Sequence, residues 1–187
     1  MTALINLYLR LAHYLEYRIG AGLMPTLARF LFAAIFALYY WNSAMTKLGG
    51  DLNHLVTPSA NAFAQILPKA AEAISFDVTQ ATTIQKSIVL AGTWGELVLP
   101  VLIILGLFTR PAAIGMVVFV VVQSLTDLYG HNAIADGKTL GAWFDGAPDS
   151  VILDQRALWI VLLLVLVFRG AGPLSLDQFI KRRLRVS

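Results

Sequence analysis

Four long apolar runs, separated by polar segments, dominate the chain. They cover residues 27–46, 88–109, 111–128 and 157–168. A helix needs about 20 mainly apolar residues to cross a bilayer, and only the last run is clearly shorter than that. The pattern therefore predicts an all-α protein, a bundle of four transmembrane helices. In such a protein a charge inside a run carries more information than a motif in a loop.

The four runs and their connections use nearly all of the chain, so residues 1–187 are predicted to form a single membrane domain. Two connections are long, residues 47–87 and 129–156, and both lie at the same end of the bundle. The composition agrees, because 13% of the residues are charged and a soluble domain carries about twice that share. The chain has no cysteine, which excludes disulfides and cysteine-ligated iron–sulfur clusters.

Both ends of the chain are predicted to form amphipathic helices at the membrane interface. Apolar side chains near the N-terminus recur at helical spacing, namely Leu4, Leu7, Leu11, Tyr14 and Leu15, which is typical of a helix lying on a membrane. The alternative is a helix packed against the bundle. After the fourth run, Ser175 followed by Gln178 resembles a capping box and would start a basic helix over residues 176–185.

Basic residues are concentrated at one end of the predicted bundle. The two tails and the turn near residue 110 hold nine of the fourteen lysines and arginines. Cytoplasmic segments carry such an excess, so both termini are predicted to be cytoplasmic, in a bacterial inner membrane, with the long connections outside. The residues expected to anchor the protein to lipid head groups are Arg29, Arg110, Arg169, Lys181, Arg182 and Arg183.

Glu96 is the most informative residue, because it lies inside the second apolar run. A carboxylate at that depth usually faces the bundle interior and usually marks function. Pro100 follows four residues later and deprives the Glu96 carbonyl of its helical partner. Arg110 is about 21 Å away along a helix, so a cationic partner would be Lys47 or Arg156. Glu96 is either a catalytic group that exchanges protons or a structural hydrogen-bonding group.

A second polar cluster lies at the outer end of the third run. Gln123, Asp127 and His131 are four residues apart and share one face if the helix continues. Polar and aromatic residues of the other runs fall at a similar depth, whereas the inner halves are aliphatic. This predicts a ligand pocket near the outer leaflet, lined by Tyr39, Asn42, Lys47, Trp94, Glu96, Gln123 and Asp127. An ordinary interfacial belt of aromatic residues is the alternative.

Other chemistries have little support. The three histidines form no pair deep in two runs, which argues against a buried haem and against a metal site. Asp127 and His131 could supply half of one, but a solvated pair at a helix end is commoner. The basic residues fit lipid contact, and nothing favours nucleic acid.

Several of these features together resemble the DoxX family of small four-span membrane proteins. They are Arg29, Lys47 and Glu96, the turn Gly106-Leu107-Phe108-Thr109-Arg110-Pro111-Ala112-Ala113, and the tail Gly170-Ala171-Gly172-Pro173-Leu174-Ser175-Leu176-Asp177. The resemblance extends over residues 27–178. Where family members often have glycine before the lysine, this chain has Trp41-Asn42-Ser43-Ala44, which makes that corner more polar.

The resemblance implies a membrane partner of redox proteins, because the family takes its name from a subunit linked to quinone-dependent oxidation of sulfur compounds. The first hypothesis is a redox-linked subunit with a quinone site and no covalent cofactor, which receives electrons from a membrane or periplasmic redox protein. The second is a non-catalytic accessory subunit of a larger respiratory or photosynthetic complex. A small transporter, formed by a homo-oligomer, is the third. All three imply contact with membrane lipid.

Overall fold

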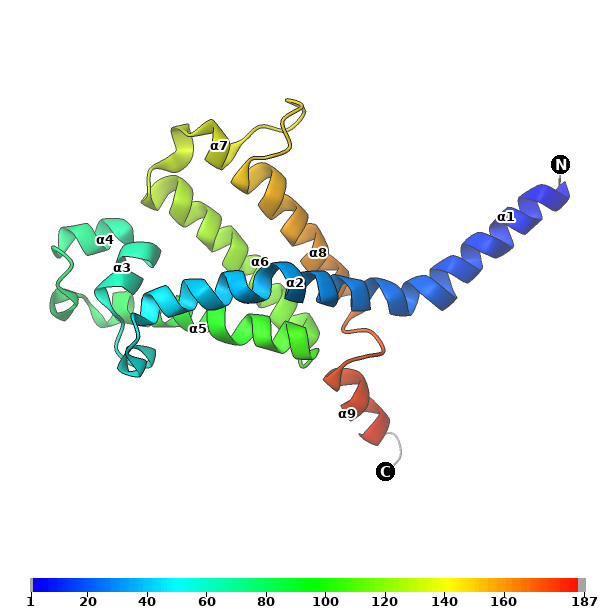
Figure 1. Ribbon diagram of the computed structural model, residues 1–187, viewed down its shortest axis with the longest axis horizontal. Coiled ribbons are helices and arrows are strands. Elements are labelled where there is room, and N and C mark those ends of the chain that lie inside the picture. Colours follow the sequence, from blue (N-terminus) through cyan, green and yellow to red (C-terminus); the bar gives the residue numbers. More distant parts are fainter. Residues whose placement is uncertain (1, 185–187) are drawn as a thin grey trace.

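The computed structural model describes residues 2–184 and contains no strand within that range. Four helical segments are long and apolar enough to cross a membrane, namely Thr2–Leu48, Thr83–Leu105, Thr109–Gly130 and Val151–Arg169. The predicted all-α bundle of four spans is thereby confirmed. Figure 1 shows both ends of the chain on the same side of the bundle. We call that side the turn end and the side with the long connections the loop end.

The first span is the end of a continuous helical segment that starts at Thr2. It comprises α1 (Thr2–Tyr14), a π-helical stretch (Leu15–Gly20) and α2 (Ala21–Leu48). The predicted N-terminal helix is therefore joined to the first span without a loop. Figure 1 shows a bend between α1 and α2, and a π-helical stretch is a known cause of such bends. None of the residues of α1 is buried, so the alternative of packing on the bundle is wrong.

The second and third spans differ from the predicted bounds at both ends for local reasons. Helix α5 (Thr83–Leu105) begins before residue 88 because Thr82 and Gln85 form a capping box. It ends before residue 109 because Gly106 adopts the left-handed conformation, with φ at 68°, that commonly terminates helices. Helix α6 (Thr109–Leu125) follows at once and continues as a π-helical stretch, Thr126–Gly130.

The fourth span is longer than the predicted residues 157–168. A π-helical stretch (Val151–Arg156) precedes α8 (Ala157–Arg169), so the span gains a turn at the loop end. The C-terminal helix α9 runs over Leu176–Leu184, and the predicted last residue, Arg185, lies outside the described residues. Ser175 caps α9 by accepting a hydrogen bond from the backbone of Gln178 at 3.2 Å.

Short helices fill the two long connections at the loop end. The first connection contains a 3-10 turn (Leu52–Leu55), α3 (Ala60–Ile66), α4 (Pro68–Ala73) and a second 3-10 turn (Val78–Gln80). Apolar residues at helical spacing from Ala62 to Ile74 predict a short amphipathic helix broken at Pro68, and the break is confirmed, because this proline opens α4. The second connection contains a 3-10 turn (Ala133–Ala135) and α7 (Gly137–Leu140), and residues 141–150 form no helix.

The four spans pack in a ring, in the order α2, α5, α6, α8. Phe32, Phe36 and Tyr40 of α2 form an aromatic row in the core, against Met116 of α6 and Leu163 of α8. Small residues of α6 let neighbouring helices approach closely, which is how helices associate where lipid removes the hydrophobic driving force. Figure 1 shows α5 and α6 close together at their tight turn and diverging towards the loop end.

Arg29 holds the turn end together. Its guanidinium donates to the carbonyls of Ile103 and Ile104 in the last turn of α5, and to the carbonyls of Ala171 and Leu174 in the tail. Ile103 and Ile104 are among the last four residues of α5, whose carbonyls have no N–H partner four residues further along the helix. Arg29 was predicted to reach lipid head groups, but its guanidinium binds protein carbonyls.

Asp177 completes this end of the bundle. Its carboxylate accepts hydrogen bonds from the backbone N–H groups of Phe108 at 2.8 Å and Thr109 at 2.9 Å, which caps the start of α6. The Asp177 N–H donates to the carbonyl of Gly106 at 2.8 Å. The turn at residues 106–113 and the tail at residues 170–177 therefore form one unit.

Candidate ligand-binding site

A buried ion pair joins the loop end of α2 to the middle of α5. The Lys47 ammonium lies 2.9 Å from Oε2 and 3.0 Å from Oε1 of Glu96. Lys47 is 4% exposed and Glu96 is 5% exposed, so both charged side chains are buried within the protein. The prediction that Lys47 or Arg156 would partner Glu96 is settled in favour of Lys47.

Ser43 ties the two charged groups together. Its hydroxyl donates to Glu96 Oε1 at 3.1 Å and accepts from Lys47 Nζ at 2.9 Å. Ser43 lies four residues before Lys47, so the two side chains share one face of α2. Ser43 was not among the residues predicted to line the pocket, although its spacing relative to Lys47 was a usable signal.

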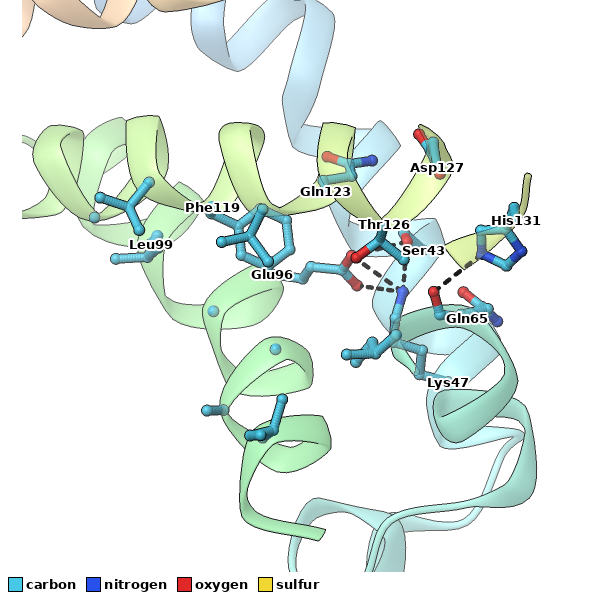
Figure 2. A pocket seen from close by; sticks show the side chains of 18 residues that line it. Ser43, Lys47, Gln65, Glu96, Leu99, Phe119, Gln123, Thr126, Asp127 and His131 are labelled. Atoms are coloured by element: carbon cyan, nitrogen blue, oxygen red, sulfur yellow. Dashed lines mark hydrogen bonds and ion pairs between the residues drawn. The ribbon is translucent and has the colours of Figure 1, made fainter. Parts of the chain in front are cut away.

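A cavity of about 520 Å³ lies beside the ion pair, between the diverging helices α5 and α6. Figure 2 shows its polar side chains gathered at one end, near Lys47, and Leu99 and Phe119 at the other. Its lining residues are Ser43, Lys47, Gln65, Ile66, Ile88, Ala91, Gly92, Gly95, Glu96, Leu99, Gly115, Val118, Phe119, Val122, Gln123, Thr126, Asp127 and His131. The cavity thus combines a charged end with a larger apolar part.

Three glycines shape the walls of this cavity. A Cβ on Gly95 would lie 3.1 Å from the ring of Phe119, and one on Gly115 would lie 3.1 Å from the side chain of Leu99. Across the wall towards α3, a Cβ on Gly92 would lie 2.8 Å from Ile66. These positions let bulky side chains of one helix pack directly on the backbone of another, which sets the spacing of the helices around the cavity.

The cavity opens on the lipid-facing side of the bundle. Ile88, Val118 and Val122 belong to its lining and are 47%, 56% and 52% exposed. Because these exposed side chains are aliphatic and belong to membrane-spanning helices, the opening faces hydrocarbon. A ligand with an apolar tail could therefore enter from the bilayer.

A second ion pair joins α6 to the fourth span. Arg156 Nη2 lies 2.6 Å from Asp127 Oδ2, and Arg156 Nη1 donates to Ser124 at 3.2 Å. The guanidinium also lies 6.0 Å from the ring centroid of Trp159. Asp127 lines the cavity, so Arg156 influences the site through it rather than through Glu96. This pairing was not predicted from the sequence.

The remaining predicted site residues have different surroundings. Gln123 lines the cavity and donates to the Tyr39 hydroxyl at 2.9 Å, whereas Tyr39 itself is not in the lining. The indole of Trp94 donates to the Leu55 carbonyl at 2.9 Å, away from the cavity. Asn42 is exposed and does not line the cavity either. Four of the seven predicted residues thus come together around it: Lys47, Glu96, Gln123 and Asp127.

The loop end contributes residues at the mouth of the polar end. A ring nitrogen of His131 lies 3.3 Å from the Gln65 carbonyl of α3, and both residues line the cavity with Thr126. The predicted shared face of Gln123, Asp127 and His131 is confirmed to the extent that all three line the same cavity. In the part of the chain that is described, no group of three acidic or histidine side chains is placed to hold a metal ion.

Comparison with known proteins places the chain in a family. The model of the DoxX family matches residues 24–126, more than half of the chain, and the chain belongs to that family. The match includes Arg29, Lys47, Glu96 and the turn at residues 106–113, while the tail at residues 170–177 lies beyond it. No curated protein and no solved structure matches the chain.

The polar end of the cavity can donate and accept hydrogen bonds and can exchange a proton. Lys47 supplies hydrogen-bond donors, Glu96 supplies an acceptor that can also carry a proton, and Ser43 can do both. These groups lie at one end of a mostly apolar space, which is the usual arrangement of a small-molecule site, where a few polar groups fix the orientation of an otherwise apolar ligand.

Proposed function

We propose that this member of the DoxX family binds a quinone in the cavity between α5 and α6 and acts as a redox-linked membrane subunit. The observation that carries the proposal is the buried Lys47–Glu96 pair on the wall of a cavity whose other lining is mainly apolar. A quinone has the matching form, with carbonyl oxygens on a ring and a long hydrocarbon tail.

The volume of the cavity is suitable for a quinone. The volume of about 520 Å³ falls in the usual range for small-molecule sites, about 300–1,000 Å³, and accommodates a substituted ring with the first part of a tail. Phe119 and Leu99 flank the apolar part. The rest of the tail would leave past the exposed aliphatic side chains Val118 and Val122 into the bilayer.

The Lys47–Glu96 ion pair would bind a ring oxygen of the quinone and exchange a proton with it. Lys47 donates a hydrogen bond to one carbonyl oxygen, which favours negative charge there. Glu96 exchanges a proton with the same oxygen, because its carboxylate can hold or release one beside the ammonium. Conversion of a quinone to a quinol takes two electrons and two protons. The electrons would come from a partner redox protein. Glu96 would pass one proton to the oxygen that Lys47 contacts, and the second proton would reach the other ring oxygen from the polar mouth of the cavity.

The mouth of the cavity provides a route for those protons. Asp127, His131 and Thr126 line the polar end of the cavity on the side of the loop end, and each can give or accept a proton or a hydrogen bond. Under the proposed orientation, with the turn end in the cytoplasm of a bacterial inner membrane, this mouth faces the periplasm. A periplasmic redox protein would then dock on the two long connections.

The proposal is tested by measuring the affinity of the purified protein in nanodiscs for decylubiquinone and for a short-chain menaquinone. Glu96→Gln and Lys47→Gln should each weaken binding about tenfold or more, which corresponds to about 1.4 kcal/mol. Glu72→Gln is the matched control, because Glu72 is an exposed carboxylate on α4 outside the cavity. Equal affinity of all four proteins would contradict the proposal.

One observation favours the accessory-subunit alternative. The N-terminal helix α1 has no buried residue, and Leu4, Leu7 and Tyr8 are 79%, 66% and 68% exposed. Such a surface suits contact with another membrane protein. If removal of residues 2–14 releases a stoichiometric partner from native membranes while Glu96→Gln changes nothing, the accessory role is favoured over the quinone site.

A further inference from the structure

A second cavity lies at the turn end, separate from the proposed quinone site. Its volume is about 610 Å³. It is bounded by the start of α6, the end of α8, the tail that follows α8, and α9. The residues that matter for its chemistry are Thr109, Arg110, Arg169, Gly170, Asp177 and Lys181.

Three cationic side chains from three different helices line this cavity. Arg110 comes from α6, Arg169 is the last residue of α8, and Lys181 comes from α9. Over residues 2–184 none of the three forms an ion pair. The one carboxylate in the lining, Asp177, already accepts backbone hydrogen bonds at both of its oxygens. The cavity therefore has a surplus of positive charge.

The fold holds Arg110 in place above the cavity. Its Nη2 donates to the carbonyl of Phe168 at the end of α8, at 3.4 Å, and a Cβ on Gly170 would lie 3.6 Å from its Nε. Gly170 and Gly172 both have φ near 80°, at 79° and 77°, a conformation that side chains other than glycine rarely adopt. These two glycines turn the chain after α8 so that the tail forms a wall of the cavity.

We infer that this cavity binds the phosphate of an anionic phospholipid, such as phosphatidylglycerol. Guanidinium groups bind phosphate oxygens through paired hydrogen bonds, and an ammonium adds a further point charge. Basic pockets between membrane helices are known to take anionic head groups. The inference does not depend on the proposed quinone site.

The position of the cavity identifies a lipid rather than a soluble phosphate. Arg169 and Thr109 mark the ends of α8 and α6, so the cavity lies at the depth of the lipid head groups. Helix α9 borders the cavity with Gln178 and Lys181. Outside the lining the same helix carries Phe179 and Ile180, which are 56% and 44% exposed, and such apolar side chains beside basic ones suit insertion between acyl chains. A lipid in the cavity would connect α6, α8 and α9.

The test is the retention of phosphatidylglycerol by the full chain, measured by native mass spectrometry from micelles with equal amounts of phosphatidylglycerol and phosphatidylcholine. Wild-type protein should retain phosphatidylglycerol preferentially. Arg110→Gln and Lys181→Gln combined should reduce the retained fraction about tenfold. Arg182→Gln and Arg183→Gln combined are the matched control, since both residues lie on α9 outside the cavity lining and their replacement also removes two positive charges.

Three results would overturn the inference. The first is an equal loss when Arg182→Gln and Arg183→Gln are combined, which would indicate diffuse attraction to a basic helix. The second is equal retention of both lipids by wild-type protein. The third is complete displacement of phosphatidylglycerol by excess inorganic phosphate, which would indicate a soluble phosphate site. A melting temperature for each variant shows that it is folded, and Arg169→Gln, tested alone, gives a second measurement if the double variant is unstable.

Discussion

The ammonium of Lys47 and the carboxylate of Glu96 lie 2.9 Å apart, although the two residues come from different spans and are almost completely buried. In a membrane interior neither charge would be tolerated alone. The pair therefore has two roles. It clamps α2 to α5, and in the proposed function it presents a donor and a proton carrier to the cavity. Variants of the two residues separate these roles.

Removing one member of the pair should destabilise the protein more than removing both. Glu96→Ala or Lys47→Met leaves an uncompensated buried charge and should lower the free energy of unfolding by about 3–5 kcal/mol. The double variant Lys47→Met with Glu96→Leu should recover a large part of that loss. Reversible unfolding of the protein in bicelles measures all three. A double variant as unstable as the sum of the two singles would contradict the structure.

Capping by Asp177 should contribute to the stability of the turn end. Asp177→Ala removes the acceptor for the N–H groups of Phe108 and Thr109, and loss of a helix cap costs about 1 kcal/mol. Asp177→Asn keeps one acceptor oxygen and should cost less. Thermal unfolding in detergent, followed by circular dichroism, ranks the variants. If Asp177→Asn is less stable than Asp177→Ala, the acceptor oxygen of residue 177 does not stabilise the start of α6.

Gly106 should not tolerate a side chain. Its φ is 68°, and a Cβ there would lie 2.6 Å from Ser175 and 2.7 Å from the Arg29 guanidinium. Gly106→Ala combines the left-handed strain, about 1–3 kcal/mol, with displacement of the tail, so its melting temperature should fall clearly. Gly137→Ala is the control, because nothing lies within 4 Å of a Cβ at that position. Similar melting temperatures for the two variants would contradict the observed packing of the turn.

Filling the cavity between α5 and α6 should block ligand binding without unfolding the protein. Ala91 lines the cavity and is exposed, so Ala91→Trp places an indole in the space while leaving the core intact. The affinity for decylubiquinone should fall about tenfold. Ala34→Trp on the exposed face of α2 adds the same side chain away from the cavity and should have no effect. A loss with both variants would show that the ligand does not depend on this cavity.

Much of the fold was predictable because hydrophobic period and local stop signals determine it. The apolar runs gave the four spans, and Pro68 gave the break between α3 and α4. The bent but continuous connection between α1 and α2 could not be predicted. The π-helical stretch at residues 15–20 contains no proline, so no local signal marks the bend.

Contacts between distant parts of the chain account for the other omissions. The pairing of Arg156 with Asp127 and the capping of α6 by Asp177 join residues whose relative positions depend on how the helices pack, and a one-dimensional pattern does not contain that information. The Lys47–Glu96 pair was predictable as one of two possibilities. A buried carboxylate is stable only beside a cation, and only Lys47 and Arg156 were expected within reach of Glu96.

Helical phase explains why two of the predicted site residues, Asn42 and Trp94, lie away from the cavity. Side chains one or two positions apart on a helix do not share a face. Asn42 directly precedes Ser43, and Trp94 precedes Glu96 by two positions, so each points away from the residue that lines the cavity. Position along a helix alone does not specify the direction in which a side chain points.

The most direct test of the quinone site is to locate a photoreactive quinone on the protein. An azido-ubiquinone analogue is irradiated with the protein in nanodiscs, and labelled peptides are identified by mass spectrometry, with and without excess decylubiquinone. The proposed quinone site predicts labelling, suppressed by the competitor, within residues 91–99 of α5 and residues 115–127 of the third span, which contain most of the cavity lining. Labelling confined to the exposed faces of α1 or α8, or labelling that the competitor does not reduce, would contradict it.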